Sequence, residues 1–306
     1  MPLRISPLGG DVSHRRYFRL LFDDGATAIG VHYPVEMRST CRRFLATTAL
    51  LEGGGIRVPS VLHSECDSGF SIVEDLGSTS LYDLADRPWT KLRHRFEAAM
   101  ATISRIQRLP AADIAHLNPE LGADALQAEV DLAWTRLLSR PEISGDAELR
   151  SLLAEALDAT CRNLGAAPLI PCHRDFMARN LMIDSDGRLA LIDHQDLRLG
   201  PRFYDLASLL NDSLYPPRSE ERHLRNRAIQ NAEDLLVYRR CVVQRTLKAA
   251  ATFVSFAGRG HDRHLPLVRP TLARAAHHLE RLPEGGPFAT ELARRWHALD
   301  VTALSA

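Results

Sequence analysis

The spacing of apolar residues predicts a strand-rich first part of the chain. Short apolar runs bounded by turn residues predict four strands, at 17–22, 28–33, 60–63 and 69–74. Residues 36–52 instead carry apolar side chains at helical spacing, and Gly53-Gly54-Gly55 ends that helix. We therefore expect residues 1–77 to form a small β-rich lobe.

The pattern becomes helical after Gly77. Helices are predicted at 90–108, 122–139, 146–163, 203–212, 219–257, 266–281 and 288–303. The exception is a short hairpin, with arms at 181–184 and 189–193. The chain is thus predicted to have an α+β fold with two lobes, a β-rich one at 1–77 and a larger helical one at 78–306.

The segment around this hairpin carries side chains suited to phosphoryl transfer. Asp175 precedes Asn180 by five residues, and Asp193 ends the second arm of the hairpin. Phosphoryl transfer needs a carboxylate that orients the attacking hydroxyl, together with oxygen ligands for Mg²⁺. Either aspartate alone would be better explained as a turn residue or a helix cap. Together, in the order His-x-Asp-x-x-x-x-Asn, hairpin, Asp, they favour a kinase catalytic site.

Three segments extend this pattern: His173-Arg174-Asp175-x-x-x-x-Asn180-Leu181, Leu191-Ile192-Asp193-His194-Gln195-Asp196 and Gly200-Pro201-Arg202-Phe203-Tyr204-Asp205-Leu206-Ala207. They resemble the aminoglycoside phosphotransferase family, whose members have a protein-kinase-like fold and phosphorylate small molecules with ATP. The resemblance implies that Asp175 is the general base and that Asn180 and Asp193 bind Mg²⁺. It also implies that Asp205 is a structural tether for the catalytic loop.

Further segments give a narrower resemblance that covers most of the chain. They are 10–19, 58–62, 69–70, 74–77, 205–212 and 244–248. They are similar to the bacterial kinases that phosphorylate the anomeric hydroxyl of N-acetylmuramate and N-acetylglucosamine in cell-wall sugar recycling. Other acceptors stay open, namely an aminoglycoside, choline or homoserine. A non-catalytic protein that binds nucleotide is a further alternative.

The change from strand to helix at Glu74-Asp75-Leu76-Gly77 suggests where adenine binds. A hinge between lobes offers backbone C=O and N–H groups, for which side-chain identity matters little. We expect the backbones of Glu74 and Leu76 to bind the nucleotide. The same residues also fit an ordinary turn between lobes, and the two interpretations are compatible.

The phosphate-binding side departs from protein kinases, which use a lysine on the third strand. The chain has only two lysines, Lys91 and Lys248, so the first lobe has none. His32 falls near the expected position. Arg15 and Arg16 are the predicted substitutes, because guanidinium groups bind phosphate oxygens in a bidentate fork. Each could instead be a solvated surface charge, and the missing lysine also favours the non-catalytic alternative.

A sugar acceptor needs polar groups near Asp175. The local candidates are Arg179, Gln195 and Asp196. If the acceptor carries a carboxylate, an arginine should face it, and the candidates for that role are Arg179, Arg202 and Arg245. The alternative for Arg245, together with Lys248, is a polar stripe on a long amphipathic helix.

Composition limits the other classes of function. Formal net charge is zero, with 38 basic and 38 acidic residues, so we expect neither a nucleic-acid nor a membrane partner. The N-terminus lacks the apolar core of a signal peptide, and no apolar run could span a bilayer. The five cysteines are scattered and odd in number. They therefore predict neither a disulfide framework nor a zinc site, and they favour a cytoplasmic protein.

Overall fold

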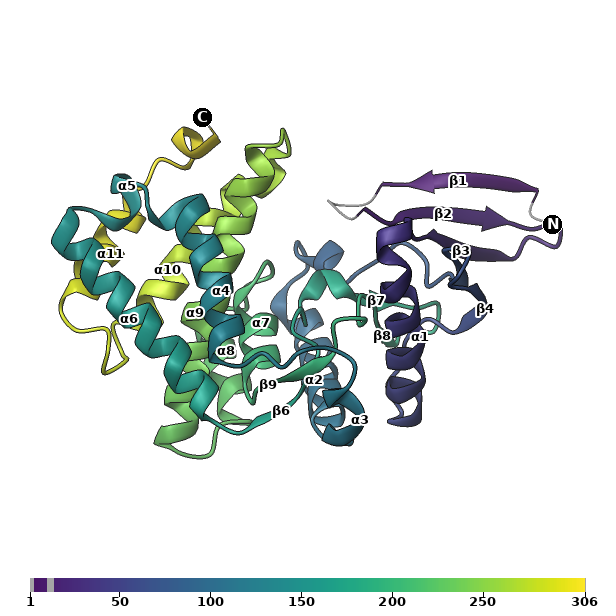
Figure 1. Ribbon diagram of the computed structural model, residues 1–306, viewed down its shortest axis with the longest axis horizontal. Coiled ribbons are helices and arrows are strands. Elements are labelled where there is room, and N and C mark those ends of the chain that lie inside the picture. The colour runs from purple at the N-terminus through teal and green to yellow at the C-terminus, as the bar shows by residue number, and fades with distance from the viewer. Residues whose placement is uncertain (1–2, 10–13, 306) are drawn as a thin grey trace. The chain divides into compact units, whose positions relative to one another are not determined.

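The computed structural model describes residues 3–9 and 14–305 (Figure 1). The predicted segment 10–13, part of the resemblance described above, lies outside them. The chain divides into two compact units. The first comprises Met1–Asn118 and Arg179–Leu197, and the second comprises Pro119–Ala178 and Arg198–Ala306. One unit contains a five-stranded antiparallel sheet and the other is mostly helical, so the α+β prediction is confirmed.

The first unit is built on this sheet, with strand order β1-β2-β3-β5-β4. Its elements are β1 (Arg4–Leu8), β2 (Arg16–Leu21), β3 (Thr27–His32), η1 (Val35–Met37), α1 (Arg38–Gly53), β4 (Val61–Glu65), β5 (Phe70–Glu74), η2 (Tyr82–Leu84), α2 (Trp89–Ile106) and α3 (Ala111–Ala115). Helix α1 buries Phe44 against Val31, Tyr33 and Val73 of the sheet segment. This packing covers one face of the sheet with apolar side chains. An isolated pair of strands would have no such cover and would be only marginally stable.

A hairpin distant in sequence joins the first unit. Strands β7 (Leu181–Ile183) and β8 (Leu189–Leu191) form it, preceded by the 3-10 turn η4 (Ala178–Asn180). Leu81 N donates to Leu181 O at 2.8 Å, and Leu191 N donates to Arg57 O at 2.8 Å. These backbone bonds and helix α2 extend the compact unit to Asn118, past the predicted lobe boundary at 77/78. That boundary stays a prediction.

The second unit is arranged around the long helix α9, whose neighbours include α4, α6, α7 and α10 (Figure 1). Its elements are α4 (Ala123–Ala133), a π-helical turn η3 (Trp134–Leu138), α5 (Pro141–Ser144), α6 (Ala147–Ala166), β6 (Leu169–Cys172), β9 (Arg198–Pro201), α7 (Tyr204–Asn211), α8 (Arg218–Asn226), α9 (Ala232–Ala257), η5 (Asp262–Leu267), α10 (Val268–Leu279), α11 (Phe288–His297) and η6 (Val301–Ser305). Most of α9 is buried, as expected for a helix surrounded by others.

Several expectations for single elements differ from the structure, among them strand β1, which was not predicted. The helix predicted at 219–257 is two helices, α8 and α9, because Asn231 caps the second by accepting a hydrogen bond from Asp234 N at 2.8 Å. The short strands β6 and β9 pair with each other but were not expected. Each has four residues and contains a proline, Pro171 or Pro201, and proline argues against a strand when only the sequence is considered.

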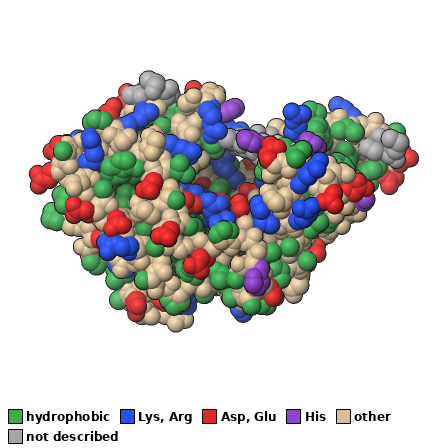
Figure 2. Space-filling view, in the orientation of Figure 1, with side chains coloured by type: hydrophobic (Ala, Val, Ile, Leu, Met, Phe, Trp, Pro, Cys, Tyr) green, Lys and Arg blue, Asp and Glu red, His purple; other side chains and the backbone are tan. Residues whose placement is uncertain are grey.

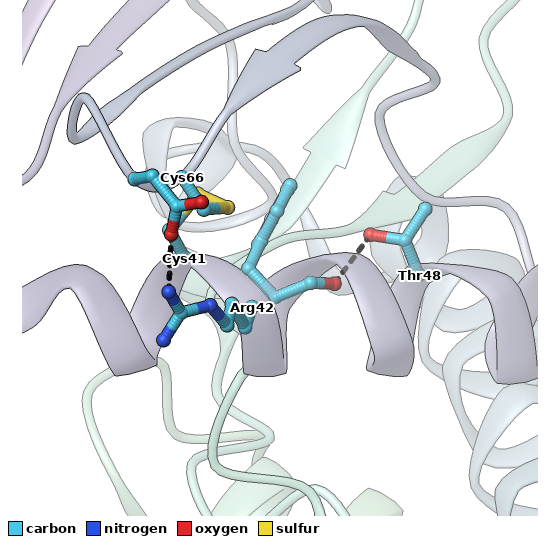
Figure 3. Close-up of a disulfide and its surroundings, with 6 residues drawn as sticks. Cys41, Arg42, Thr48 and Cys66 are labelled. Atoms are coloured by element: carbon cyan, nitrogen blue, oxygen red, sulfur yellow. Dashed lines mark hydrogen bonds and ion pairs between the residues drawn. A yellow bond between two sulfur atoms is a disulfide. The ribbon is translucent and has the colours of Figure 1, made fainter.

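The expectation of no disulfide is wrong. Cys41 on α1 and Cys66, beyond β4, are bonded, with Cα atoms 5.6 Å apart (Figure 3). The pair lies 25 residues apart in sequence and meets because α1 packs beside the β4–β5 connection. Arg42 also contacts Asp67 next to the bridge. The other three cysteines, Cys161, Cys172 and Cys241, are buried and free.

Opening the disulfide should destabilise the protein. The bridge joins positions 25 residues apart, and closing a loop of this size stabilises by about 3 kcal/mol. We expect Cys41→Ser to lower the free energy of unfolding by about that amount, measured by urea denaturation. Reductant should lower the stability of the wild type equally and leave the variant unchanged. A wild type insensitive to reductant would contradict the prediction.

The surface carries charges of both signs. Acidic, basic and hydrophobic side chains are interspersed on the face that Figure 2 shows. Within residues 3–9 and 14–305, no helix is long and apolar enough to cross a membrane.

Candidate active site

The backbone that presents Asp175 is held by a buried carboxylate. Arg174 has a φ of +76°, a left-handed conformation that is costly for a residue with a side chain. Asp205, at the start of α7, accepts hydrogen bonds from His173 N at 2.7 Å and Arg174 N at 2.9 Å. Burial raises the pKa of Asp205 despite these bonds. The contact is the tether that the resemblance implies for Asp205.

The Asp175 carboxylate lies among three cations within the second unit. Arg245 Nη2 is 3.2 Å from Oδ1, Lys248 Nζ is 3.8 Å from the same oxygen, and Arg174 Nη1 is 4.0 Å from Oδ2. Burial would raise the pKa of Asp175, but Lys248, Arg245 and Arg174 outweigh it and hold the pKa well below its usual range. The Asp175 side chain is therefore ionised at neutral pH.

Glu129, on α4, holds two of these cations from the other side. Its Oε1 is 2.7 Å from Arg174 Nη2 and 2.9 Å from Lys248 Nζ. Its Oε2 accepts hydrogen bonds from Tyr204 and Gln244, at 3.2 and 3.0 Å. Burial opposes its charge, but Lys248 and Arg174 lower the pKa of Glu129 to about 2. Sequence reasoning missed Glu129, because a single acid in a helix gives no local signal.

Arg245 pairs with a second carboxylate besides that of Asp175. Its Nη2 is 3.0 Å from Asp212 Oδ2, and its Nε is 3.3 Å from Ser208 Oγ. Arg245 is only 3% exposed. The polar stripe expected for Arg245 and Lys248 is therefore on the buried side of α9. In the sequence, the one feature that indicated a shared position on the helix was the spacing of three residues between Arg245 and Lys248, next to Gln244.

The hairpin of the first unit brings the two predicted metal ligands to neighbouring positions. Ile192 N donates to Asn180 O at 3.0 Å, so Asn180 lies opposite the residue before Asp193. Asp193 has a φ of +61°. Next to it, buried His194 stacks on Phe44 of α1, with ring centroids 4.7 Å apart. This stacking, and a 2.8 Å contact from Thr47 to His194 Nδ1, fix the segment against α1.

Of the two predicted phosphate-binding arginines, the structure brings Arg15 to Asp193. Arg15 Nη2 is 2.8 Å from Asp193 Oδ1, and Arg15 Nη1 donates to Gln195 Oε1 at 3.2 Å. Burial lowers the pKa of Arg15, but Tyr17 and Asp193 outweigh it and raise the pKa. Arg16 begins β2 and lines a groove with Phe18, His32 and Phe70 on the sheet. Arg15 lies in the bend before β2, so its side chain is not bound to the alternation of the strand.

The predicted hinge is held by ion pairs. Glu74 accepts a hydrogen bond from Arg57 Nη1 at 2.7 Å, which together with the Ser60 backbone N–H lowers its pKa. Glu74 N donates to Ser60 O at 2.9 Å. Arg19 Nε is 2.7 Å from Asp75 Oδ2. Within residues 3–9 and 14–305, the backbone of Leu76 has no hydrogen-bond partner.

The remaining predicted acceptor residues lie in different surroundings. Arg179 stacks over the ring of Tyr82, 3.8 Å from its centroid. Gln195 is buried and donates to Asp193 Oδ1 at 2.9 Å, while Asp196 is half-buried in the turn that follows. Arg202, in the other unit, is 48% exposed and pairs with Asp234 at 3.4 Å. The structure thus brings Gln195 together with Asp193, and Arg245 with Asp175.

The predicted metal ligands fit Mg²⁺ by their chemistry. Asp193 and Asn180 offer hard oxygen donors, and the Asp193 side chain is 39% exposed. Mg²⁺ is usually held by one or two protein carboxylates together with substrate phosphates and water. No cluster of three or more His, Cys, Asp or Glu side chains suited to a metal occurs among the described residues.

The chain is similar in sequence to proteins named as kinases of amino sugars. N-acetylmuramate/N-acetylglucosamine kinase of Neisseria meningitidis serogroup B is 30% identical over 205 residues, which cover 66% of this chain and 60% of the relative. The protein of the same name from Pseudomonas aeruginosa is 28% identical over 314 residues, which cover 93% of this chain and 90% of the relative. The chain thus spans less than two thirds of the Neisseria relative and nine tenths of the Pseudomonas one.

Solved structures show the same fold at low sequence identity. A choline kinase from Streptococcus pneumoniae superimposes with a TM-score of 0.60 at 15% identity, covering 97% of this chain and 94% of that one. An ADP-bound aminoglycoside phosphotransferase gives 0.61 at 14% identity, covering 96% and 93%. Both confirm the expected kinase-like bilobal fold. Residues 4–241 match the sequence pattern of one family, and the chain therefore belongs to the phosphotransferase enzyme family.

Proposed function

We propose that this protein is an ATP-dependent kinase that phosphorylates the anomeric hydroxyl of N-acetylmuramate or N-acetylglucosamine. The observation that carries the proposal is the Asp175 carboxylate, with a tethered backbone and one oxygen 3.2 Å from Arg245. A carboxylate fixed in this way can orient a hydroxyl for in-line attack. The acceptor is supported by the four relatives, all of which are named for these two amino sugars.

In the proposed reaction, Asp175 hydrogen-bonds the acceptor hydroxyl and takes its proton as the oxygen attacks the γ-phosphorus. The new oxygen–phosphorus bond forms while the bond to the β–γ bridging oxygen breaks, so ADP leaves with that electron pair. Asn180 and Asp193 would hold Mg²⁺, which would supply positive charge at the phosphates. Arg15 binds phosphate oxygens in place of the missing lysine, and Arg16 remains the second candidate for that role.

The other residues bind the two substrates. The backbones of Glu74 and Leu76 bind adenine. The acceptor contacts are drawn from five side chains: Arg179, Gln195, Asp196, Arg202 and Arg245. Arg245 is the arginine best supported for a lactyl carboxylate, because it lies at Asp175. A cytoplasmic location goes with this function, since ATP and recycled cell-wall sugars are available there.

The test is purified protein with Mg-ATP and a panel of acceptors, followed by phosphorus NMR. The panel contains N-acetylmuramate, N-acetylglucosamine, an aminoglycoside, choline and homoserine. We expect an anomeric phosphate ester on an N-acetylated amino sugar. An ester at C6, or on one of the other acceptors, would replace the proposed substrate. ATP binding without turnover of any acceptor would instead support the non-catalytic alternative.

A further inference from the structure

Lys248 occupies an unusual position for a lysine in this chain. It lies on α9 with only 17% of its side chain exposed, and its ammonium group is 2.9 Å from Glu129 Oε1 and 3.8 Å from Asp175 Oδ1. The chain's other lysine, Lys91, is exposed near the start of α2. A buried ammonium is costly unless carboxylates surround it, so this placement requires both acids.

The two arginines beside Asp175 do not duplicate the lysine. Arg245 is shared between Asp175 and Asp212, which follows α7. Arg174 also contacts Glu129 and Asp175, at 2.7 and 4.0 Å, but it belongs to the same loop as Asp175. Lys248 joins the same two carboxylates, Asp175 and Glu129, from α9, an element outside the loop. Lys248 is therefore the cation from outside the loop that joins the Asp175 carboxylate to Glu129 on α4.

We propose that Lys248, anchored by Glu129, is a positioning residue that holds the Asp175 carboxylate in the orientation needed for phosphoryl transfer. The inference rests on the proposed role of Asp175 as the base. Lys248 acts through Asp175, by fixing Oδ1 so that the second oxygen can face the acceptor hydroxyl. Loss of the ammonium charge removes one of the cations at Asp175 Oδ1 and so loosens the orientation of the carboxylate.

This role predicts that turnover depends on pH in the alkaline range, where Lys248 loses its proton. Burial lowers the pKa of Lys248, although Asp175 and Glu129 oppose the shift. The groups that face it are Asp175 and Arg174 from the loop, Glu129 from α4 and Arg245 from its own helix. Because the pKa is lowered, Lys248 loses its proton below the usual lysine pKa of about 10.4. Turnover should therefore fall as pH rises through that range.

The first experiment compares Lys248→Met, Lys248→Arg and Lys91→Met. We expect Lys248→Met to lower kcat about 10- to 100-fold while KM for ATP stays unchanged, since the ionic contact that orients Asp175 is lost. Lys248→Arg should recover most of kcat and lack the alkaline fall, because arginine keeps its charge. Lys91→Met makes the same chemical change on the surface and should match the wild type.

A second measurement does not depend on turnover. With only two lysines in the chain, ¹³Cε-lysine labelling gives two signals, and Lys91→Met assigns them. Lys248 should titrate at lower pH than Lys91, with the same midpoint as the fall in kcat. Glu129→Gln removes a carboxylate that raises the pKa of Lys248, so both midpoints should move to lower pH.

The outcomes separate this inference from the proposed function. If the wild type phosphorylates no acceptor, the proposed function fails, and the lysine titration still decides whether Glu129 and Asp175 hold Lys248. A Lys248→Met enzyme with wild-type kcat overturns the inference. So does an alkaline fall that persists in Lys248→Arg, or a Lys248 signal that does not respond to Glu129→Gln. If Lys248→Arg fails to fold, the Glu129→Gln titration supplies the same decision.

Discussion

Replacing Asp175 by Asn should lower kcat by about 10²- to 10⁴-fold, the usual contribution of a positioned general base. The amide keeps the shape of the side chain but cannot accept the hydroxyl proton. Affinity for Mg-ATP should stay within about twofold, because the residues proposed to bind nucleotide are untouched. Single-turnover kinetics and calorimetric titration with Mg-ATP measure the two effects separately.

The fold should tolerate this substitution because each neighbouring cation keeps another carboxylate. Lys248 and Arg174 remain paired with Glu129, and Arg245 remains paired with Asp212. Asp175→Asn therefore leaves no cation without an anion, which is the situation that destabilises a buried ion pair most. The lost activity should thus reflect chemistry and not unfolding.

The matched control is Asp158→Asn, which makes the same change on an exposed helix position of the same unit. Asp158 pairs with Arg162 four residues later, a surface contact of little energetic weight. It should leave kcat unchanged. An Asp175→Asn enzyme within tenfold of the wild type would contradict the assignment of the base.

The sequence alone predicted the parts of the protein that depend on residues close together in the chain. The loop spacing from Asp175 to Asn180 and the hairpin that ends near Asp193 are local patterns, and the structure has that hairpin and the loop tether at Asp205. The helices at 90–108 and 146–163 are present within a few residues, because their apolar periodicity is strong.

What escaped prediction depends on contacts between distant segments. Glu129 is linked to Asp175 through Lys248, and no sequence pattern near residue 129 predicts this contact. Cys41 and Cys66 meet only because α1 packs beside the β4–β5 connection. The side of α9 that carries Arg245 looks like a solvated stripe until α7 and α4 cover it. Buried charges violate the usual pattern of apolar cores, so sequence rules fail at the candidate site itself.

Asp193→Asn should produce the second large loss, about 10³-fold in kcat, because it removes the charged member of the proposed Mg²⁺ ligand pair. The amide keeps one oxygen donor but no negative charge, and Arg15 loses an ionic partner 2.8 Å away. A readout apart from turnover is the affinity for ATP measured with and without Mg²⁺. Wild-type protein should bind ATP more tightly when Mg²⁺ is present, and the variant should lose that difference.

Two comparisons distinguish a ligand role for Asp193 from a role in holding Arg15. Arg15→Met leaves the carboxylate in place, so it should weaken ATP binding while preserving the gain in affinity from Mg²⁺. Asp186→Asn makes the matched change in the exposed turn of the same hairpin, where Asp186 pairs with the exposed Arg188. It should behave as the wild type. If Asp193→Asn retains the Mg²⁺-dependent gain and Arg15→Met loses it, the carboxylate serves to hold the arginine, and the metal must be bound through other groups.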